Sequence, residues 1–388
     1  MRFSCSLTTA ILTAAIAVSG CKKPPTEPAK PTPPPEDPQA TRIGFFAPMS
    51  GAQASFGTDA LNGAKLAVEE LNAGGGVLGH PVKLMVKDTQ SRTDETEAVV
   101  AELTDSDKAA VLIGEIATDR SLVAAPLAQA RGVPMITPAS TSEKVTAVGD
   151  GIFRVCYTDA FQAGVMAKFA RSIDVQKAAI LSDASTPYSA GLAESFRKEF
   201  SALGGTIVAE ESYRTGDKDF AAQLQAIKAQ SPEIIFLPSY YAEAALIIQE
   251  ARKQGIDAPF LGTDGWDSPE FLKVGGGAVD NSYFCSHFAS ETTSEAVKRF
   301  VGAYAAKFGN APPPLAALTY DAVMLAADAL KRAGSTDPAG LRQALAATAD
   351  FPGVTGGITF DADRNPRKPG IVIRVDEGKF TYLETVDP

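Results

Sequence analysis

Residues 42–86 read RIGFFAPMSGAQASFGTDALNGAKLAVEELNAGGGVLGHPVKLMV, and their pattern decides the fold. The apolar runs RIGFF 42–46 and VKLMV 82–86 each predict a buried strand. Between residues 60 and 71, apolar side chains recur at helical spacing, and the charged residues lie off that stripe. This spacing predicts an amphipathic helix. Two strands joined by such a helix form a βαβ unit, which favours a parallel sheet.

The same alternation continues through most of the chain. Further strands, with helical stretches between them, are predicted at AAVLIG 109–114, PMIT 134–137, KAAILS 177–182, TIVAEES 206–212, EIIFLP 233–238 and PFLG 259–262. They fall into two series, 41–154 and 157–284, and a chain of this length exceeds what one core usually supports. We therefore expect an α/β protein with two doubly wound, Rossmann-like lobes.

The end of the chain follows a different order. Three successive helices are predicted at 295–309, 315–334 and 338–348, and the strands GITFD 357–361, GIVIRV 370–375 and KFTYLET 379–385 come after them. The Glu-Gly pair before the last strand predicts a tight turn, and hence a terminal hairpin. This order indicates a chain that crosses repeatedly between the lobes.

The beginning of the chain carries signals for export and anchoring. Arg2 and the apolar run Leu7–Val18, which is too short to span a bilayer, predict a cleaved signal peptide at 1–20. The segment VSGC resembles a bacterial lipobox, which implies lipidation of Cys21; an ordinary secretory signal is the alternative. Residues 21–40 contain eight prolines, so an extended linker is expected after the lipidated cysteine. The expected location is periplasmic, anchored to a bacterial membrane by lipid.

Composition and motifs exclude several classes of protein. The net charge of −10 argues against nucleic-acid binding, which needs basic patches. No stretch after Cys21 is long and apolar enough to cross a membrane. Neither His80 nor His287 lies near a recognisable nucleophile, and the sequence contains no Walker A, H-E-x-x-H or zinc-type cysteine spacing. We therefore expect neither catalysis nor a metal or cofactor.

Polar residues follow two of the predicted strands in the first lobe. The loop GEIATDRS places Thr118 near a helix N-terminus, and the loop TPASTSEK contains Thr141 and a capping box of Ser140 and Glu143. Because ligands of such folds meet the carboxyl ends of strands, these groups can converge on an anion, most simply a carboxylate. Helix capping alone would also explain both threonines, and the residues by themselves favour that simpler role.

Five stretches together resemble type I periplasmic binding proteins of the leucine/isoleucine/valine-binding family. They are residues 44–91, FRVCYTDAFQAG 153–164, GTDGWDSPEF 262–271, LTYDAVMLAADALKRAGSTDP 318–338 and FPGVTGGITFDADRNP 351–366. The resemblance implies two lobes joined by three crossing strands, near Phe153–Tyr157, Tyr283–His287 and Gly356–Phe360. The lobes would then comprise 41–154 plus 288–355, and 157–284 plus 359–388.

The resemblance also implies how a ligand would be held. Thr118 and Thr141, beside Ser140, would bind the α-carboxylate of an amino acid, and the carbonyl of Ala139 would accept from its α-amino group. Asp264 stands where this family carries an acidic partner for the amino group; an ordinary surface turn aspartate is the alternative.

Aromatic residues are expected to complete the pocket. Tyr188 and Tyr240 each follow a strand of the second lobe, Trp266 follows Asp264, and Phe56 occupies the first lobe's loop. Each of these rings could also be ordinary packing. Phe56 replaces a tyrosine that is typical of the family, so an apolar ligand side chain fits best, but leucine, isoleucine, valine and phenylalanine stay equally open.

We therefore expect a monomeric solute-binding protein that delivers a small hydrophobic amino acid to the permease of an ABC importer. A sensor or envelope-regulatory lipoprotein that uses the same fold is the alternative. Cys156 and Cys285 both fall in predicted crossing strands, and whether they form a disulfide or remain buried thiols stays open.

Overall fold

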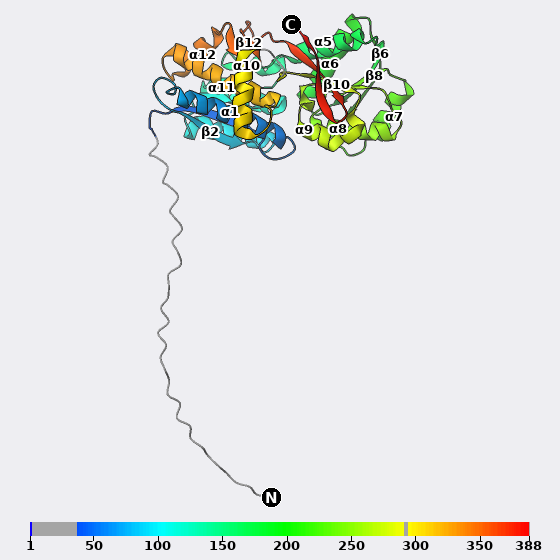
Figure 1. Cartoon of the computed structure of the whole chain (residues 1–388), viewed down its shortest axis with the longest axis horizontal. Coiled ribbons are helices and arrows are strands. Elements are labelled where there is room, and N and C mark those ends of the chain that lie inside the picture. The colour runs from blue at the N-terminus through cyan, green and yellow to red at the C-terminus, as the bar shows by residue number, and fades with distance from the viewer. Residues whose placement is uncertain (2–36, 291–293, 388) are drawn as a thin grey trace. The chain divides into compact units, whose positions relative to one another are not determined.

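The computed structural model describes residue 1, residues 37–290 and residues 294–387 (Figure 1). From Asp37 onward, these residues form one compact unit. The expected signal peptide, Cys21 and most of the proline-rich linker lie outside the described residues. In the part of the chain that is described, no helix is long and apolar enough to span a bilayer.

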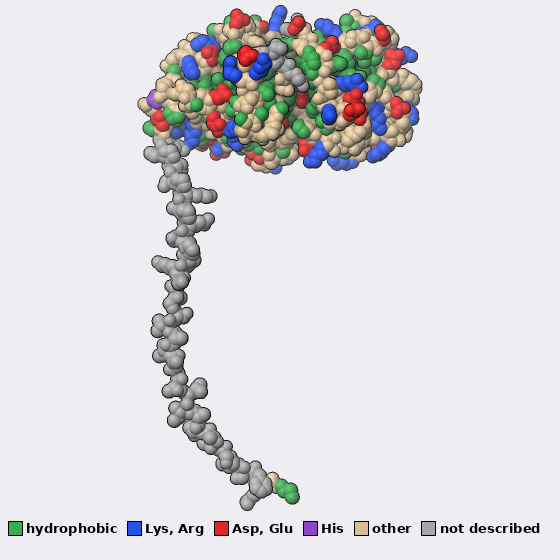
Figure 2. All heavy atoms as spheres, viewed as in Figure 1, with side chains coloured by type: hydrophobic (Ala, Val, Ile, Leu, Met, Phe, Trp, Pro, Cys, Tyr) green, Lys and Arg blue, Asp and Glu red, His purple; other side chains and the backbone are tan. Residues whose placement is uncertain are grey.

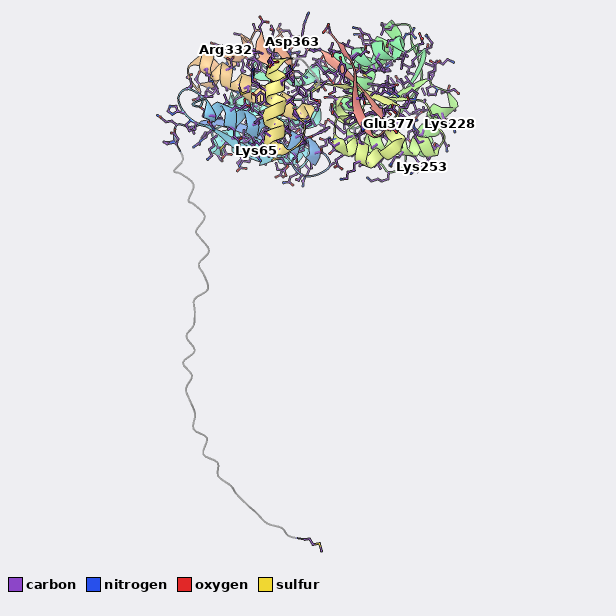
Figure 3. All side chains as sticks on the ribbon, in the orientation of Figure 1. Lys65, Lys228, Lys253, Arg332, Asp363 and Glu377 are labelled. Carbon is purple, nitrogen blue, oxygen red and sulfur yellow. The ribbon has the colours of Figure 1, made fainter. Side chains whose placement is uncertain are left out.

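The first lobe is built on five parallel strands in the order β2-β1-β3-β4-β5. Its strands are β1 (Thr41–Ala47), β2 (Val82–Asp88), β3 (Val111–Ile113), β4 (Met135–Thr137) and β5 (Ile152–Arg154). Its helices are α1 (Ala54–Ala73), α2 (Thr93–Ala101) with the π-helical turn η1 (Glu102–Ser106), α3 (Thr118–Arg131) and α4 (Glu143–Thr146). The predicted βαβ unit is confirmed, because β1 pairs in parallel with β2. Ala60, Ala64 and Ala67 of α1 are buried, whereas Lys65 points into solvent (Figure 3).

The second lobe is built on seven strands in the order β14-β13-β10-β9-β8-β6-β7. Its strands are β6 (Lys177–Asp183), β7 (Thr206–Tyr213), β8 (Ile234–Phe236), β9 (Phe260–Gly262), β10 (Ser282–Ser286), β13 (Gly370–Asp376) and β14 (Lys379–Val386). Its helices are α5 (Asp159–Ser172), α6 (Pro187–Ala202), α7 (Ala221–Ala229), α8 (Tyr241–Lys253), α9 (Pro269–Gly275) and the short turns η2 (Asp264–Trp266) and η3 (Gly276–Val279). Strands β6 to β10 are parallel, as expected.

The terminal hairpin is also confirmed. Strand β13 runs antiparallel to β10, and β14 runs antiparallel to β13. Glu377 and Gly378 at its tip both have positive φ, 49° and 69°, which is the backbone of a type I′ turn (Figure 3).

The late helices return to the first lobe. They are α10 (Glu295–Phe308), α11 (Pro314–Ala333) and α12 (Pro338–Ala346), followed by the antiparallel pair β11 (Phe351–Gly353) and β12 (Gly356–Ile358). Helix α11 packs closely along α1. A Cβ atom on Gly63 of α1 would lie 2.0 Å from the carbonyl oxygen of Ala316, so only glycine allows the two backbones to approach this closely.

The chain passes between the two sheets after β5, after β10 and before β13. The third passage lies later than the expected Gly356–Phe360, because residues that follow β12 still contact the first lobe. Phe360 packs on Phe153 with ring centroids 5.3 Å apart, and the Arg364 Nε donates to the Ile152 carbonyl at 3.1 Å. A turn closed by the carboxylate of Asp361, which accepts from two backbone N–H groups, holds this segment in place.

The first and third passages are joined by a buried lysine. The Lys368 Nζ donates to the Val155 carbonyl at 3.0 Å and to the hydroxyl of Thr355, and burial lowers the pKa of Lys368 to about 8. Cys156 and Cys285 are both buried with free thiols, so the disulfide that the sequence left open is not formed. On the face shown in Figure 2, charged side chains of both signs are interspersed.

Candidate functional site

A small cavity lies between the two lobes. Its lining comes from both lobes and comprises Phe56, Ile116, Thr118, Ala139, Tyr188, Tyr240, Asp264, Gly265 and Leu315. Six of the nine ligand contacts expected from the sequence are therefore brought together here: Phe56, Thr118, Ala139, Tyr188, Tyr240 and Asp264.

The lobes also touch directly beside this cavity. The hydroxyl oxygens of Ser55 and Ser268 lie 2.9 Å apart, and the Tyr241 hydroxyl donates to the Ala52 carbonyl at 2.9 Å. Ser55 and Ala52 belong to the first lobe, and Ser268 and Tyr241 belong to the second. The structure is therefore a closed form, with the cavity between the lobes.

Thr118 of the first lobe lines the cavity, and Thr141 lies two residues after Ala139, which also lines it. Thr118 is the first residue of α3, and Thr141 lies in the loop between β4 and α4; both are fully buried. The Thr118 hydroxyl oxygen has no hydrogen-bond partner in the protein, whereas the Thr141 hydroxyl lies beside the carboxyl of Asp159. Because buried polar groups are nearly always hydrogen-bonded, the Thr118 oxygen calls for a partner that is not part of the chain. A carboxylate at the N-terminus of α3 would also meet the positive end of that helix.

Ser140 has a different role from the one expected. Its hydroxyl lies 2.6 Å from the Ser121 hydroxyl, and its carbonyl accepts from Arg154 Nη1 at 2.6 Å. Neither Ser140 nor Thr141 lines the cavity itself. Ser140 therefore supports the loop from behind, because its polar groups are already paired within the protein.

A buried ion pair underlies the loop that carries Thr118. The Arg120 Nε lies 2.8 Å from the Glu115 Oε1, and both side chains are almost completely buried. Glu115 also accepts from the Thr89 hydroxyl and from the Ala117 N–H, and Arg120 donates to the Gln53 side chain. Charge-assisted hydrogen bonds of this kind fix geometry strongly. Sequence reasoning missed this pair because both residues lie within an ordinary-looking loop and helix start.

The second lobe contributes a carboxylate to the cavity lining. Asp264 begins the turn η2, and its Oδ1 accepts from the Tyr188 hydroxyl at 2.7 Å. Its Oδ2 lies 3.0 Å from the Nε2 of His287, and its backbone N–H donates to the Gln162 side chain at 3.3 Å. The side chain is only 10% exposed, so Asp264 is a positioned carboxylate and not a surface turn residue. A carboxylate has about four lone-pair sites, so it can still accept from a ligand.

Two stacked tyrosines form the wall beside Asp264. The rings of Tyr188 and Tyr240 lie 4.8 Å apart and nearly parallel, and Phe56 meets Tyr240 edge-on at 6.3 Å. The Tyr240 hydroxyl is buried without a partner. Gly265 allows this close packing, because a Cβ atom there would lie 2.6 Å from the Ser239 carbonyl and 2.8 Å from the Tyr188 hydroxyl.

Trp266 is not brought to the cavity. It is fully buried and stacks on Phe271 at 4.8 Å in the core of the second lobe. A 3₁₀ turn has three residues per turn, so residues two apart point in different directions. When Asp264 faces the cavity, Trp266 must therefore face elsewhere.

Two apolar contacts were missed by sequence reasoning. Ile116 lies in the loop just before Thr118, and Leu315 lies in the first turn of α11. Ile116 lies in the loop GEIATDRS, which the sequence already singled out for Thr118, whereas Leu315 joins the site only through the late return of the chain. Together with Phe56 and Ala139 they give the cavity apolar walls. No cluster of potential metal ligands occurs among the described residues.

Comparison with known proteins agrees with this geometry. The sequence model of the periplasmic binding protein family matches residues 40–379. The chain belongs to this family. It is 29% identical over 347 residues to the Leu/Ile/Val-binding protein homolog 3 of Brucella melitensis, which covers 88% of this chain and 93% of that protein.

Solved structures of the family superpose on nearly the whole body. The leucine binding protein LivK from Thermotoga maritima has a TM-score of 0.87 at 36% identity and covers 90% of this chain and 99% of its own. The LivJ substrate-binding protein from Streptococcus pneumoniae, solved with isoleucine, has a TM-score of 0.85 at 35% identity and covers 90% and 100%. The family and fold expected from the sequence are confirmed, and these relatives are binding proteins of transporters, not enzymes. Membership implies an extracytoplasmic location.

Proposed function

We propose that this protein captures a hydrophobic or branched-chain L-amino acid between its lobes and delivers it to an ABC importer while tethered to the membrane through Cys21. The observation that carries the proposal is a cavity between the lobes whose lining includes Thr118 with its unpaired hydroxyl, the carboxylate-bearing Asp264 and several apolar side chains. An amino acid has a complementary group for each: a carboxylate for the hydroxyl, an ammonium for the carboxylate and a side chain for the apolar walls.

Asp264 supports an amino acid over a simple carboxylic acid. A buried carboxylate repels anions, so an acid without an amino group would gain nothing at this end of the cavity. A hydrogen bond from an ammonium to this carboxylate contributes about 1.5–3 kcal/mol. Ala139 also lines the cavity, and its carbonyl would offer the ammonium a second acceptor.

The apolar walls support a hydrophobic side chain. Phe56 has no hydroxyl group, and Ile116 and Leu315 have no polar side-chain atom, so a polar ligand side chain that packed against these three residues would lose its hydrogen bonds to water without replacement. Relatives with leucine or isoleucine in their names, or with isoleucine bound, are consistent with this assignment.

The anchor and the delivery step rest on other grounds. Cys21 and the linker are argued from the sequence. The importer is argued from the ABC transporter named for a relative from Desulfitobacterium hafniense that was solved with Leu. Replacement of Cys21 by serine should move the protein from the membrane fraction to the soluble fraction. Light scattering of residues 37–388 should give the mass of a monomer.

Calorimetry on residues 37–388 tests the ligand class. Leucine, isoleucine, valine and phenylalanine are compared with 4-methylpentanoate, which is leucine without its amino group. We expect binding of at least one amino acid, and binding of 4-methylpentanoate that is more than tenfold weaker than that of leucine. The absence of heat with all four amino acids at millimolar concentration would contradict the proposal. Native mass spectrometry of the freshly purified protein provides an independent check, because a retained ligand would appear by its mass.

A further inference from the structure

His287 connects the expected ammonium site with the segments that join the lobes. Its Nε2 lies 3.0 Å from the Asp264 Oδ2, and its ring stacks on Tyr157 with centroids 3.8 Å apart and planes inclined by 26°. Tyr157 lies on the first passage between the lobes, and His287 directly follows β10, where the second passage begins. The ring therefore contacts both passages and Asp264 at once.

The surroundings of this ring favour its neutral form. The imidazole is almost fully buried, and burial lowers its pKa, while the carboxylate of Asp264 opposes that effect and the ammonium of Lys368 adds to it. Tyr157 also faces the ring, and burial raises the pKa of its hydroxyl well above the usual value, so it carries no charge. A neutral ring that keeps the Nε2 proton donates to Asp264 and leaves the carboxylate its full negative charge.

Protonation of the ring would change the site in two ways. The imidazolium would compensate the negative charge of Asp264. It would also place a positive charge within hydrogen-bond distance of the carboxylate that receives the ligand's ammonium. Both effects weaken the binding of a cationic group. Neither effect weakens the binding of a ligand that has only a carboxylate.

We infer that His287 is a positioning residue for Asp264, and that uptake of a proton by its ring weakens the amino-acid complex. The inference rests on the proposed amino-acid site. By linkage, the effect is reciprocal: a tenfold loss of affinity on protonation requires the bound ligand to lower the pKa of His287 by about one unit.

Other acids near the site titrate in the same range and must be separated from His287. Burial raises the pKa of Asp159 to about 8 and that of Asp267 to about 7. Their protonation would also remove negative charge near Asp264 as the pH falls. They remain when His287 is replaced, so the comparison of His287→Gln with the unaltered protein isolates the contribution of the ring.

Nuclear magnetic resonance can follow the ring directly, because the whole chain contains only two histidines. The other, His80, lies 3.6 Å from Asp37 at the surface, so His80→Gln leaves a single histidine signal and serves as the matched control. Histidine-labelled residues 37–388 are titrated from pH 8 to pH 4.5 with and without leucine. We expect a neutral ring with its proton on Nε2 at pH 7.5, and a lower pKa with leucine present.

Calorimetry between pH 7.5 and pH 5 supplies the second measurement. We expect the dissociation constant of leucine to rise at least about tenfold in the unaltered protein and in His80→Gln, in step with the titration of His287. His287→Gln, whose amide can still donate to Asp264, should lose most of the pH dependence of leucine binding, whatever its affinity at pH 7.5. The affinity of 4-methylpentanoate should not fall.

Three results would overturn the inference: a His287 ring that stays neutral down to pH 4.5, a His287 pKa that leucine leaves unchanged, or an equal pH dependence in His287→Gln. The first two are measured on the unaltered ring and need no folded variant. If no amino acid binds at any pH, the proposed function fails instead, so the two failures are distinguishable.

Discussion

Replacement of Asp264 by asparagine tests the polarity of the cavity most sharply. Asparagine has the same shape, and its side-chain oxygen can still accept from the Tyr188 hydroxyl, so the turn η2 should persist. What disappears is the negative charge that faces the ligand's ammonium. Loss of a charge-assisted hydrogen bond costs about 1.5–3 kcal/mol, which corresponds to a 10- to 150-fold weaker complex.

The assay is calorimetry with leucine and with 4-methylpentanoate on the same preparation. We expect Asp264→Asn to weaken the binding of leucine by that factor. The binding of 4-methylpentanoate should stay unchanged or become tighter, because an anion binds better when a nearby carboxylate is removed. Asp267→Asn is the matched control: its carboxylate is also buried and accepts from Ser286, but it does not line the cavity. Equal losses for both ligands, or no loss for leucine in a folded variant, would refute the assignment of Asp264.

Three further predictions follow from other parts of the molecule. Thr118→Val should weaken the binding of leucine and of 4-methylpentanoate alike, by about 10- to 150-fold in calorimetry, because one hydrogen bond to the charged carboxylate is lost. A loss for leucine alone would contradict this role. Burial raises the pKa of Asp159 to about 8, so the stability that its protonated form contributes is present at low pH and is lost as the pH rises toward 8. Asp159→Asn should therefore reduce the fall in the thermal unfolding midpoint between pH 5.5 and pH 8.5. A fall as large as that of the unaltered protein would show that this carboxyl is not responsible. Gly63→Ala should destabilise the protein in denaturant titration by about 1–3 kcal/mol, because the new Cβ would lie 2.0 Å from the Ala316 carbonyl. Gly302→Ala in α10, where nothing lies within 4 Å of the new Cβ, is the control and should stabilise the protein by about 0.5–1 kcal/mol. Equal effects of the two substitutions would refute the close approach of α1 and α11.

The fold was largely predictable because its evidence is local. The strands and helices alternate with clear periodicity, and the parallel pairing of β1 with β2 follows from the helix between them. The third passage was misplaced because its position depends on contacts far apart in sequence. Arg364 reaches the Ile152 carbonyl, and no pattern within residues 351–366 reveals that partner.

In the candidate site, too, residues with a local sequence signal could be predicted, and residues that join through distant contacts could not. Thr118, Tyr188, Tyr240 and Asp264 follow strand ends, and the carboxyl ends of parallel strands meet at one edge of a sheet, so these residues could be predicted together. Leu315 and His287 could not be predicted as parts of the site, because the chain reaches them only after it leaves one lobe for the other. Trp266 was expected from its nearness to Asp264 in sequence, but the tight turn sends the two side chains apart.

The division of the cavity between the lobes has a consequence for competing solutes. Thr118 and Ala139 belong to the first lobe, whereas the second lobe carries Asp264, Tyr188 and Tyr240. A molecule that carries only an acid or only an amine can occupy one half without drawing the other half toward it. Such a molecule would compete with the amino acid for the open form without closing the lobes, because only a zwitterion satisfies both halves at once.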